Sequence, residues 1–178
     1  HHLAPLKNLR RLNLSFSKVL PSDLIALQPI VNLEELDVTF TVFDEPKENL
    51  EAQVGELTAA EKSAYQELLV DPQKAHLLRA AVLTDRGFDQ LQHLSRLRTV
   101  RFINTVVSGV SIQRLNRYPK LERLELVAVA CPPNTFQVLG QLPEIRELSW
   151  IPFSSTEVLP TITNLQHLEQ IERGAEDL

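Results

Sequence analysis

The stretch LRTVRFINTVV at residues 97–107 decides the fold, because close variants of it recur along the chain. The variants are LRRLNLSFSKV at residues 9–19, LEELDVTFTVF at residues 33–43 and LERLELVAVAC at residues 121–131. In every copy an apolar residue stands at the first, fourth and sixth positions. Such agreement over several positions indicates that the chain is built from repeats.

The repeats keep a constant period of 24 residues, from Leu9 to Leu33, from Leu97 to Leu121 and from Leu121 to Ile145. Inside each copy apolar residues alternate with polar ones, which places them on one face of a short strand. Ahead of each copy apolar residues recur every three residues, which is typical of one face of a helix. One such ladder is Phe88, Leu91, Leu94, Leu97 and Val100. The sequence therefore predicts an α/β fold whose unit is a helix followed by a strand.

Aligned, the copies read L-x-x-L-x-L-x-x-S/T-x-hydrophobic, with Ser17, Thr41 and Thr105 at the hydroxyl position. This pattern resembles the leucine-rich-repeat family, particularly its bacterial-type repeats of similar length. The resemblance implies a solenoid shaped as a curved horseshoe, with short parallel strands on the concave face and helices on the convex face. Val129 and Phe153 depart from the pattern, so the ladder of hydroxyl groups is interrupted in the later units.

The period is broken once, because the spacing from Leu33 to Leu97 holds one full period and a further long segment. Residues 44–82 carry eight acidic and four basic side chains, which accounts for most of the net negative charge. We interpret them as an acidic helical insertion in one continuous solenoid domain. The N-terminal repeats then occupy residues 1–43, and residues 83–178 form the C-terminal repeats, which end in a degenerate cap.

The insertion has the pattern of short helices. Leu50, Val54 and Leu57 form an apolar stripe at helical spacing. Thr58–Glu61 has the pattern of a capping box at the start of a helix. Asp71 followed by a proline is typical of an N-cap and the first helical residue. Two interpretations stay open. The insertion either packs its apolar stripe on the solenoid, or acts as a lid or docking element.

Strand residues between the inward-pointing leucines should face solvent and align in columns across the units. The first two columns are Arg11, Glu35, Thr99, Arg123, Glu147 and Asn13, Asp37, Arg101, Glu125, Ser149. Because neighbouring strands lie about 4.8 Å apart, these side chains should form a continuous array. Their mixed signs suit a partner protein with complementary polar groups.

Two further columns contain apolar residues at positions that should face solvent. They are Ser15, Thr39, Ile103, Val127, Ile151 and Phe16, Phe40, Asn104, Ala128, Pro152. An exposed apolar patch indicates an interaction site, and aromatic residues dominate binding energy at interfaces. The alternative is that Phe16 and Phe40 turn into the loop core or are covered by the insertion.

The sequence contains no pattern typical of catalysis or of a cofactor or metal site. The five glycines are too scattered to form a phosphate-binding loop. The histidines lack metal-ligand neighbours, and His93 and His167 should face solvent. We expect Cys131 to be a buried, unreactive thiol. Thr84 or Asp85 should cap the helix that leads into the third intact repeat.

Composition excludes several classes of partner. The net charge is −5, so nucleic acid and membrane surfaces are poor partner candidates. No apolar run approaches the about 20 residues of a membrane span. A single cysteine favours a reducing, intracellular compartment. The absence of methionine suggests a fragment of a longer protein.

The sequence predicts a non-enzymatic module that binds another protein on its concave face. The alternatives are the substrate-recognition or regulatory region of a larger enzyme, ubiquitin-ligase-type effector or receptor, and a structural repeat that self-associates. The expected contact residues are Arg11, Phe16, Glu35, Asp37, Phe40, Arg101, Ile103, Arg123, Glu125, Val127 and Ile151.

Overall fold

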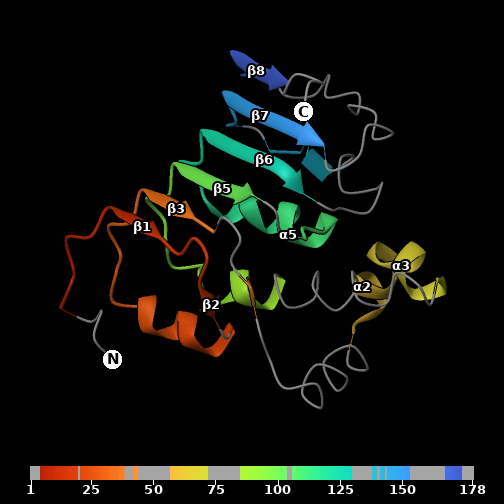
Figure 1. Cartoon of the computed structure of the whole chain (residues 1–178), viewed down its shortest axis with the longest axis horizontal. Coiled ribbons are helices and arrows are strands. Elements are labelled where there is room, and N and C mark those ends of the chain that lie inside the picture. Colours follow the sequence, from red (N-terminus) through yellow and green to blue (C-terminus); the bar gives the residue numbers. More distant parts are fainter. Residues whose placement is uncertain are drawn as a thin grey trace.

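The chain folds around a parallel β-sheet with helices beside it, an α/β arrangement (Figure 1). The computed structural model describes residues 5–19, 21–38, 42–43, 57–71, 85–103, 106–129, 138–139, 141–142, 144–152 and 167–173. No helix within these ranges is both long enough and apolar enough to cross a bilayer.

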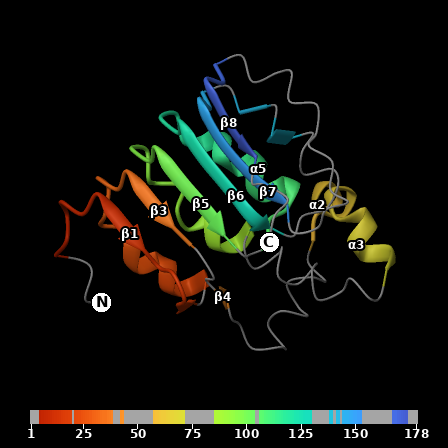
Figure 2. The ribbon, with the colours of Figure 1, turned by 45° about the horizontal axis from the view of Figure 1, so that its top comes forward.

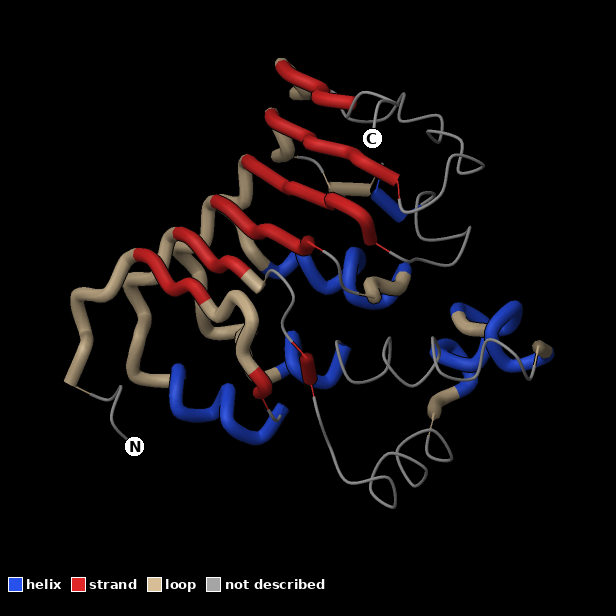
Figure 3. Tube along the Cα trace, in the orientation of Figure 1, coloured by secondary structure: helices blue, strands red, loops and turns tan. Residues whose placement is uncertain are grey.

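The main sheet has six strands, and their order in the sheet is their order along the chain. The strands are β1 (Arg11–Asn13), β3 (Glu35–Asp37), β5 (Thr99–Ile103), β6 (Arg123–Val129), β7 (Glu147–Pro152) and β8 (Gln170–Arg173). All neighbours pair in parallel. A second, two-stranded sheet joins β2 (Lys18–Val19) to β4 (Val42–Phe43). Figure 3 shows that the strands of the main sheet lie side by side in chain order.

The helices are short, and those of the repeats lie on one side of the main sheet (Figures 1 and 3). They are the 3₁₀ helix η1 (Pro21–Leu27), α2 (Ala59–Ala64), α3 (Gln66–Val70), α5 (Gly109–Arg114) and the 3₁₀ helix η3 (Leu115–Arg117), and residues 85–89 are also helical. The helices α2 and α3 come from the predicted insertion, and α2 contacts α5 (Figure 1).

The strand register follows the sequence period. Arg11 faces Glu35 and Thr99 faces Arg123, so the members of each pair stand one repeat apart in the sequence. Glu35 faces Thr99 directly, so the chain between them leaves the sheet and returns to the neighbouring position. These pairings confirm the first two predicted columns and the alignment of Ile103, Val127 and Ile151 in the third. The fourth column is wrong at its end, because a register shift in β6 places Pro152 opposite Val129 and not opposite Ala128. The last unit departs from the period, because Glu147 of β7 faces Gln170 of β8, which is slightly less than one repeat further on.

The core lies between the sheet and the helices. Leu36, Val100 and Leu124 point inward and are fully buried, and Trp150 is 1% exposed. The ladder residues that pack against them are Leu24, Leu27, Ile30, Leu33, Phe88, Leu91, Leu94, Leu97, Ile112, Leu115, Tyr118, Leu121, Leu139, Leu142 and Ile145. Full burial of one such aliphatic side chain contributes about 1.5–3 kcal/mol. The predicted ladders are therefore confirmed at these positions, whereas Leu6, in the ladder ahead of the first strand, is 43% exposed.

A helix begins where the sequence predicts one in the insertion. The helix α2 begins at Ala59, directly after Thr58, and the Lys62 N–H donates to the Thr58 carbonyl at 2.8 Å, which is an ordinary helical bond. The capping box, which needs side-chain bonds from Thr58 and Glu61, stays a prediction. Leu57 and Tyr65 are buried, whereas Leu69 and Val70 of α3 are 42% and 74% exposed, so only part of the apolar surface of residues 57–71 is covered. The helices predicted on either side of residues 57–71 lie outside the described residues.

Candidate functional site

The main sheet has a buried face and an outward face. Along β5, burial alternates: Val100 and Phe102 are buried, whereas Thr99, Arg101 and Ile103 are partly exposed. The buried apolar side chains of η1, α5 and η3 join the cluster of inward-pointing strand residues. Within the described ranges, no helix packs on the outward face (Figure 2).

Several of the predicted contact residues lie at partly exposed positions of neighbouring strands in the main sheet. The register places Arg11, Glu35, Arg123 and their neighbours in one column, and Asp37, Arg101 and Glu125 in the next. Ile103, Val127 and Ile151 are also register neighbours across β5, β6 and β7. Phe40 lies outside the described residues, so the predicted pair of Phe16 with Phe40 is untested.

The charges in the predicted columns neutralise one another. The Arg101 guanidinium donates from Nε to Glu125 at 3.0 Å and lies 3.9 Å from a Glu35 oxygen. Arg11 pairs with Glu35 at 2.9 Å, and Arg123 pairs with Glu147. Exposed ion pairs contribute only about 0.2–1 kcal/mol each, so their main effect is to hold the side chains in place. The face therefore presents fixed charges of both signs.

A further column precedes the strands and was not singled out from the sequence. Its residues alternate in sign and are Arg10, Glu34, Arg98, Glu122, Arg146 and Glu169. Three ion pairs lie along it, joining Arg10 to Glu34 at 3.4 Å, Arg98 to Glu122 at 3.1 Å and Arg146 to Glu169 at 2.6 Å. This column could have been predicted from the sequence, because its residues recur at the same repeat spacing as the strands.

A depression on the outward face is too small for an organic ligand. It has a volume of about 80 Å³ and is lined by Arg123, Glu125, Glu147, Leu148, Ser149 and Gln170. Pockets for small molecules are usually about 300–1,000 Å³. The depression therefore has the size for a few water molecules between ion-paired side chains.

Phe16 projects into solvent from the turn that follows β1. Its side chain is 78% exposed, so the interpretation that Phe16 is turned into a loop core or covered is wrong. Its φ of 58° lies in the left-handed region, which is unfavourable for a bulky residue. The turn is held by the Ser15 N–H, which donates to Asn13 Oδ1 at 2.7 Å, and by the Ser17 N–H, which donates to the Leu14 carbonyl.

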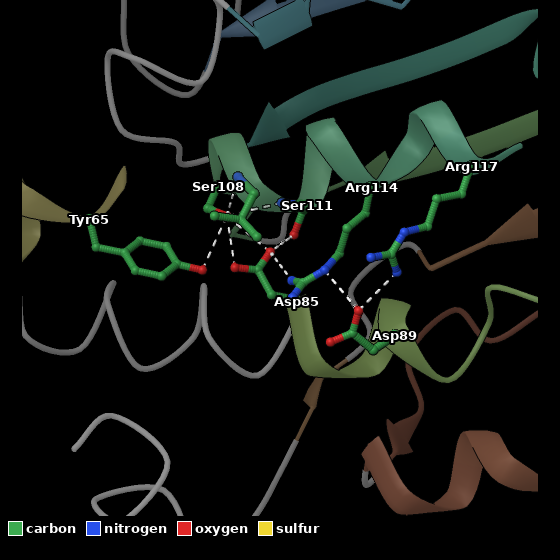
Figure 4. Close-up of polar contacts among 8 residues, drawn as sticks. Tyr65, Asp85, Asp89, Ser108, Ser111, Arg114 and Arg117 are labelled. Atoms are coloured by element: carbon green, nitrogen blue, oxygen red, sulfur yellow. Dashed lines mark hydrogen bonds and ion pairs between the residues drawn. The ribbon is translucent and has the colours of Figure 1, made fainter. Parts of the chain in front are cut away.

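A buried polar cluster around Asp85 was missed by sequence reasoning (Figure 4). Asp85 is 2% exposed, and its carboxylate accepts hydrogen bonds from Ser108 Oγ at 2.9 Å and from Ser111 Oγ. Arg114 lies 3.6 Å from the same carboxylate, and the Tyr65 hydroxyl lies 3.4 Å from Ser108 Oγ. The cluster thus joins the helical residues 85–89, α5 and the insertion.

The cap of this helix was predicted at Thr84 or Asp85. Asp85 lies within the helical residues 85–89, whereas an N-cap residue has non-helical backbone angles, and Thr84 lies outside the described residues. Burial raises the pKa of Asp85 to about 7, although the hydrogen bonds from Ser111 and Ser108 and the charge of Arg114 oppose this rise. The neutral carboxyl group is therefore much more populated at physiological pH than in an exposed aspartate.

Ser108 has a structural role at the start of α5. Ser108 Oγ donates to Asp85 and also accepts from the N–H groups of Val110 and Ser111, so it caps α5. Ser108 is 1% exposed, so these hydrogen bonds are shielded from solvent.

The predictions for the two histidines have different outcomes. His167 is exposed, as predicted. The prediction that His93 faces solvent is wrong, because its Nε2 lies 3.0 Å from the Leu27 carbonyl of the preceding unit and the ring is partly buried. Cys131 lies outside the described residues. In the parts of the chain that the structure describes, no three metal-ligating side chains converge.

Compared with protein-family models and with curated proteins, the sequence matches none of them. Any functional assignment therefore rests on the geometry of the sheet face and of the buried cluster.

Proposed function

We propose that this chain is a non-enzymatic protein-binding module whose partner docks on the outward face of the main sheet. One observation carries the proposal: in the described ranges, helices pack against a single face of a parallel sheet. Sheets built only of parallel strands are almost always covered on both faces. The outward face of β1, β3, β5, β6 and β7 is thus the surface that a partner protein would cover.

We further propose that the fold is a leucine-rich-repeat solenoid. Two observations support this proposal. Register partners in most neighbouring strands stand one repeat apart in the sequence, and η1 and α5 lie on the side of the sheet opposite its outward face. In a solenoid of this kind the outward face becomes the concave surface, where side chains from successive repeats form one extended binding surface.

The centre of the binding surface is the strip around Ile103 and Val127. These two apolar side chains are register neighbours and lie beside the Arg101–Glu125 ion pair. Protein interfaces combine a small apolar and arginine-rich centre with a polar rim. The ion pair leaves Arg101 27% and Glu125 21% exposed, so both are already fixed before a partner arrives. Such preorganisation lowers the entropy cost of binding.

The test compares two charge-matched substitutions on opposite sides of the sheet. Val127→Glu places a carboxylate in the apolar strip, whereas Gln113→Glu places one on the exposed side of α5. Proteins captured by the wild-type chain are identified and purified, and their dissociation constants are measured with all three chains. Circular dichroism melts show whether each variant remains folded.

We expect Val127→Glu to weaken binding of the purified partner at least about tenfold, since a desolvated carboxylate in an interface centre costs more than about 1.4 kcal/mol. Gln113→Glu should bind as the wild type does. Equal affinity of the wild type and a folded Val127→Glu variant would place the binding surface elsewhere and reject the proposal.

A further inference from the structure

The outward face of the main sheet is ordered in columns that run across its strands. Ile103 of β5, Val127 of β6 and Ile151 of β7 are register neighbours, and Ile103 and Val127 are partly exposed. Along a single strand the residues of this face instead change in kind, since Arg123 and Glu125 precede Val127 on β6. The apolar residues therefore form a line that crosses the strands.

The neighbouring column carries charges that alternate in sign. Asp37 of β3, Arg101 of β5 and Glu125 of β6 are successive register partners, which gives the order negative, positive, negative. Arg101 Nε donates to Glu125 at 3.0 Å, so these two charges are held in place. A partner that lies along this column meets a change of sign at each strand, about every 4.8 Å.

The spacing of the columns matches one face of an α-helix. A helix rises about 1.5 Å per residue, so side chains three residues apart are separated by about 4.5 Å along its axis and those seven apart by about 10.5 Å. Two intervals between strands amount to about 9.6 Å. A helix that crosses the strands therefore stays in step with the columns to within about 1 Å over three strands.

An extended peptide does not keep this step. Its side chains alternate between two faces, so those on one face recur about every 6.6 Å. It is about 2 Å out of step with the columns after one interval between strands and about 4 Å after two. The spacing of the columns thus favours a helical partner over an extended one.

The charged and apolar columns lie close enough for one helix to cover both. Arg101 stands two residues before Ile103 on β5, and Glu125 stands two residues before Val127 on β6. Residues two apart on a strand are separated by about 6.6 Å, whereas a helix with its side chains is about 10 Å wide. The two columns therefore fit the apolar stripe and one charged flank of an amphipathic helix.

We propose that the partner presents an amphipathic α-helix that lies across β3, β5, β6 and β7, an inference that rests on the proposed function. Its apolar stripe covers Ile103 and Val127. Its flank carries basic, acidic and basic side chains at positions i, i+3 or i+4, and i+7, opposite Asp37, Arg101 and Glu125 respectively. Complementary charges of this kind fix the register of an interface. The pattern is the same for either direction of the helix.

The test uses two displayed libraries of peptides of about 15 residues, long enough for a helix to cross four strands. Both have the same composition. One library places apolar residues at i, i+3, i+4 and i+7, and the other alternates apolar with polar residues as an extended strand does. The charged positions are varied between lysine and glutamate. The full chain selects binders, and peptides that also bind the Val127→Glu variant are removed.

We expect the selected peptides to come from the helical library and to carry lysine, glutamate and lysine at the three flank positions. They should bind the wild type at least about tenfold more tightly than the Val127→Glu variant. A peptide with glutamate, lysine and glutamate at these positions should lose a similar factor, since it meets like charges.

A charge swap within the sheet tests the register of the helix. Arg101→Glu combined with Glu125→Arg keeps the net charge and inverts the order of the two charges, so the selected peptides should invert the two matching positions. Arg98→Glu combined with Glu122→Arg is the matched control, because this ion pair of 3.1 Å joins the same two units outside the two columns. The control should leave the selected pattern unchanged. Circular dichroism melts show that each chain remains folded.

Three outcomes would overturn the helix proposal. They are selection of extended peptides, no enrichment of helical peptides by the wild type, and a selected pattern that ignores the swap of Arg101 and Glu125. The proposed function survives each of them if the purified partner still distinguishes the wild type from the Val127→Glu variant. Equal binding of that partner to both chains rejects the proposed function itself, so the two failures are distinguishable.

Discussion

Asp85 links the stability of the molecule to pH. Its carboxyl is buried, and its pKa of about 7 exceeds the ordinary value of 3.8. Between these values the folded chain holds the proton and the unfolded chain releases it. The free energy of unfolding should therefore fall as pH rises from about 4 to about 7 and then level off, by an amount on the order of a few kcal/mol.

Urea unfolding at about pH 5 and about pH 8 measures this dependence. In Asp85→Asn the side chain is neutral at both pH values, so its contribution to the pH dependence should disappear. The groups facing Asp85 are Ser108, Ser111, Arg114 and Asp89, and all of them remain in that variant. A wild type and a variant with the same pH dependence would show that Asp85 titrates normally.

Phe16 provides a second test at the scale of one residue. Its ring is largely exposed, so its removal sacrifices little core packing, while its φ of 58° is unfavourable for a bulky side chain. Asparagine adopts the left-handed region readily and alanine does not. Phe16→Asn should therefore raise the free energy of unfolding by roughly 1 kcal/mol relative to Phe16→Ala. Equal stability of the two variants in urea would mean that the turn relaxes without strain.

At the scale of elements, the start of α5 connects three segments. Ser108 caps the helix, bonds Asp85 from the preceding unit and lies beside Tyr65 of the insertion. Ser108→Ala should lower the free energy of unfolding by about 1–3 kcal/mol, because it removes a cap and leaves a buried carboxyl with fewer donors. The pKa of Asp85 should also rise, since the Ser108 bond lowers it.

Ser95→Ala at an exposed loop position is the control and should change stability by less than about 0.5 kcal/mol. A Ser108→Ala variant that matches this control in stability, with an unmoved pH transition, would mean that water replaces the hydroxyl in both of its roles.

The elements also show what the sequence can and cannot predict. Strands β1, β3, β5, β6 and β7 were predicted because inward leucines repeat at fixed intervals, and their register follows from the same interval. The hydrogen bonds of Asp85 could not be predicted in this way. Its partners Ser108 and Ser111 are 23 and 26 residues away, and such contacts between buried polar groups do not recur from repeat to repeat. The ion pairs of Arg101 depend on side-chain rotamers, which periodicity does not specify.

At the scale of the whole molecule, the order of strands predicts graded stability. Each strand of the main sheet pairs only with its neighbours along the chain, so the central strands have two partners and the described end strands have one. In such arrays stability is approximately the sum of unit terms and neighbour terms, and ends open first. Native-state hydrogen exchange should therefore be slowest in β5 and β6 and fastest in β1 and β8.

Leu168→Ala separates this graded opening from all-or-none unfolding. Leu168 is partly buried against the core just before β8, so its truncation weakens the attachment of the last unit. In a dilute sample, exchange in β8 should become about tenfold faster while β5 and β6 keep their rates, because their opening does not require β8 to remain attached. Leu124→Ala removes a fully buried side chain from the inward face of β6 and should accelerate exchange in the strands on both sides of it. If Leu168→Ala speeds exchange equally in all strands, the sheet unfolds as one cooperative unit and its neighbour-only pairing does not govern its dynamics.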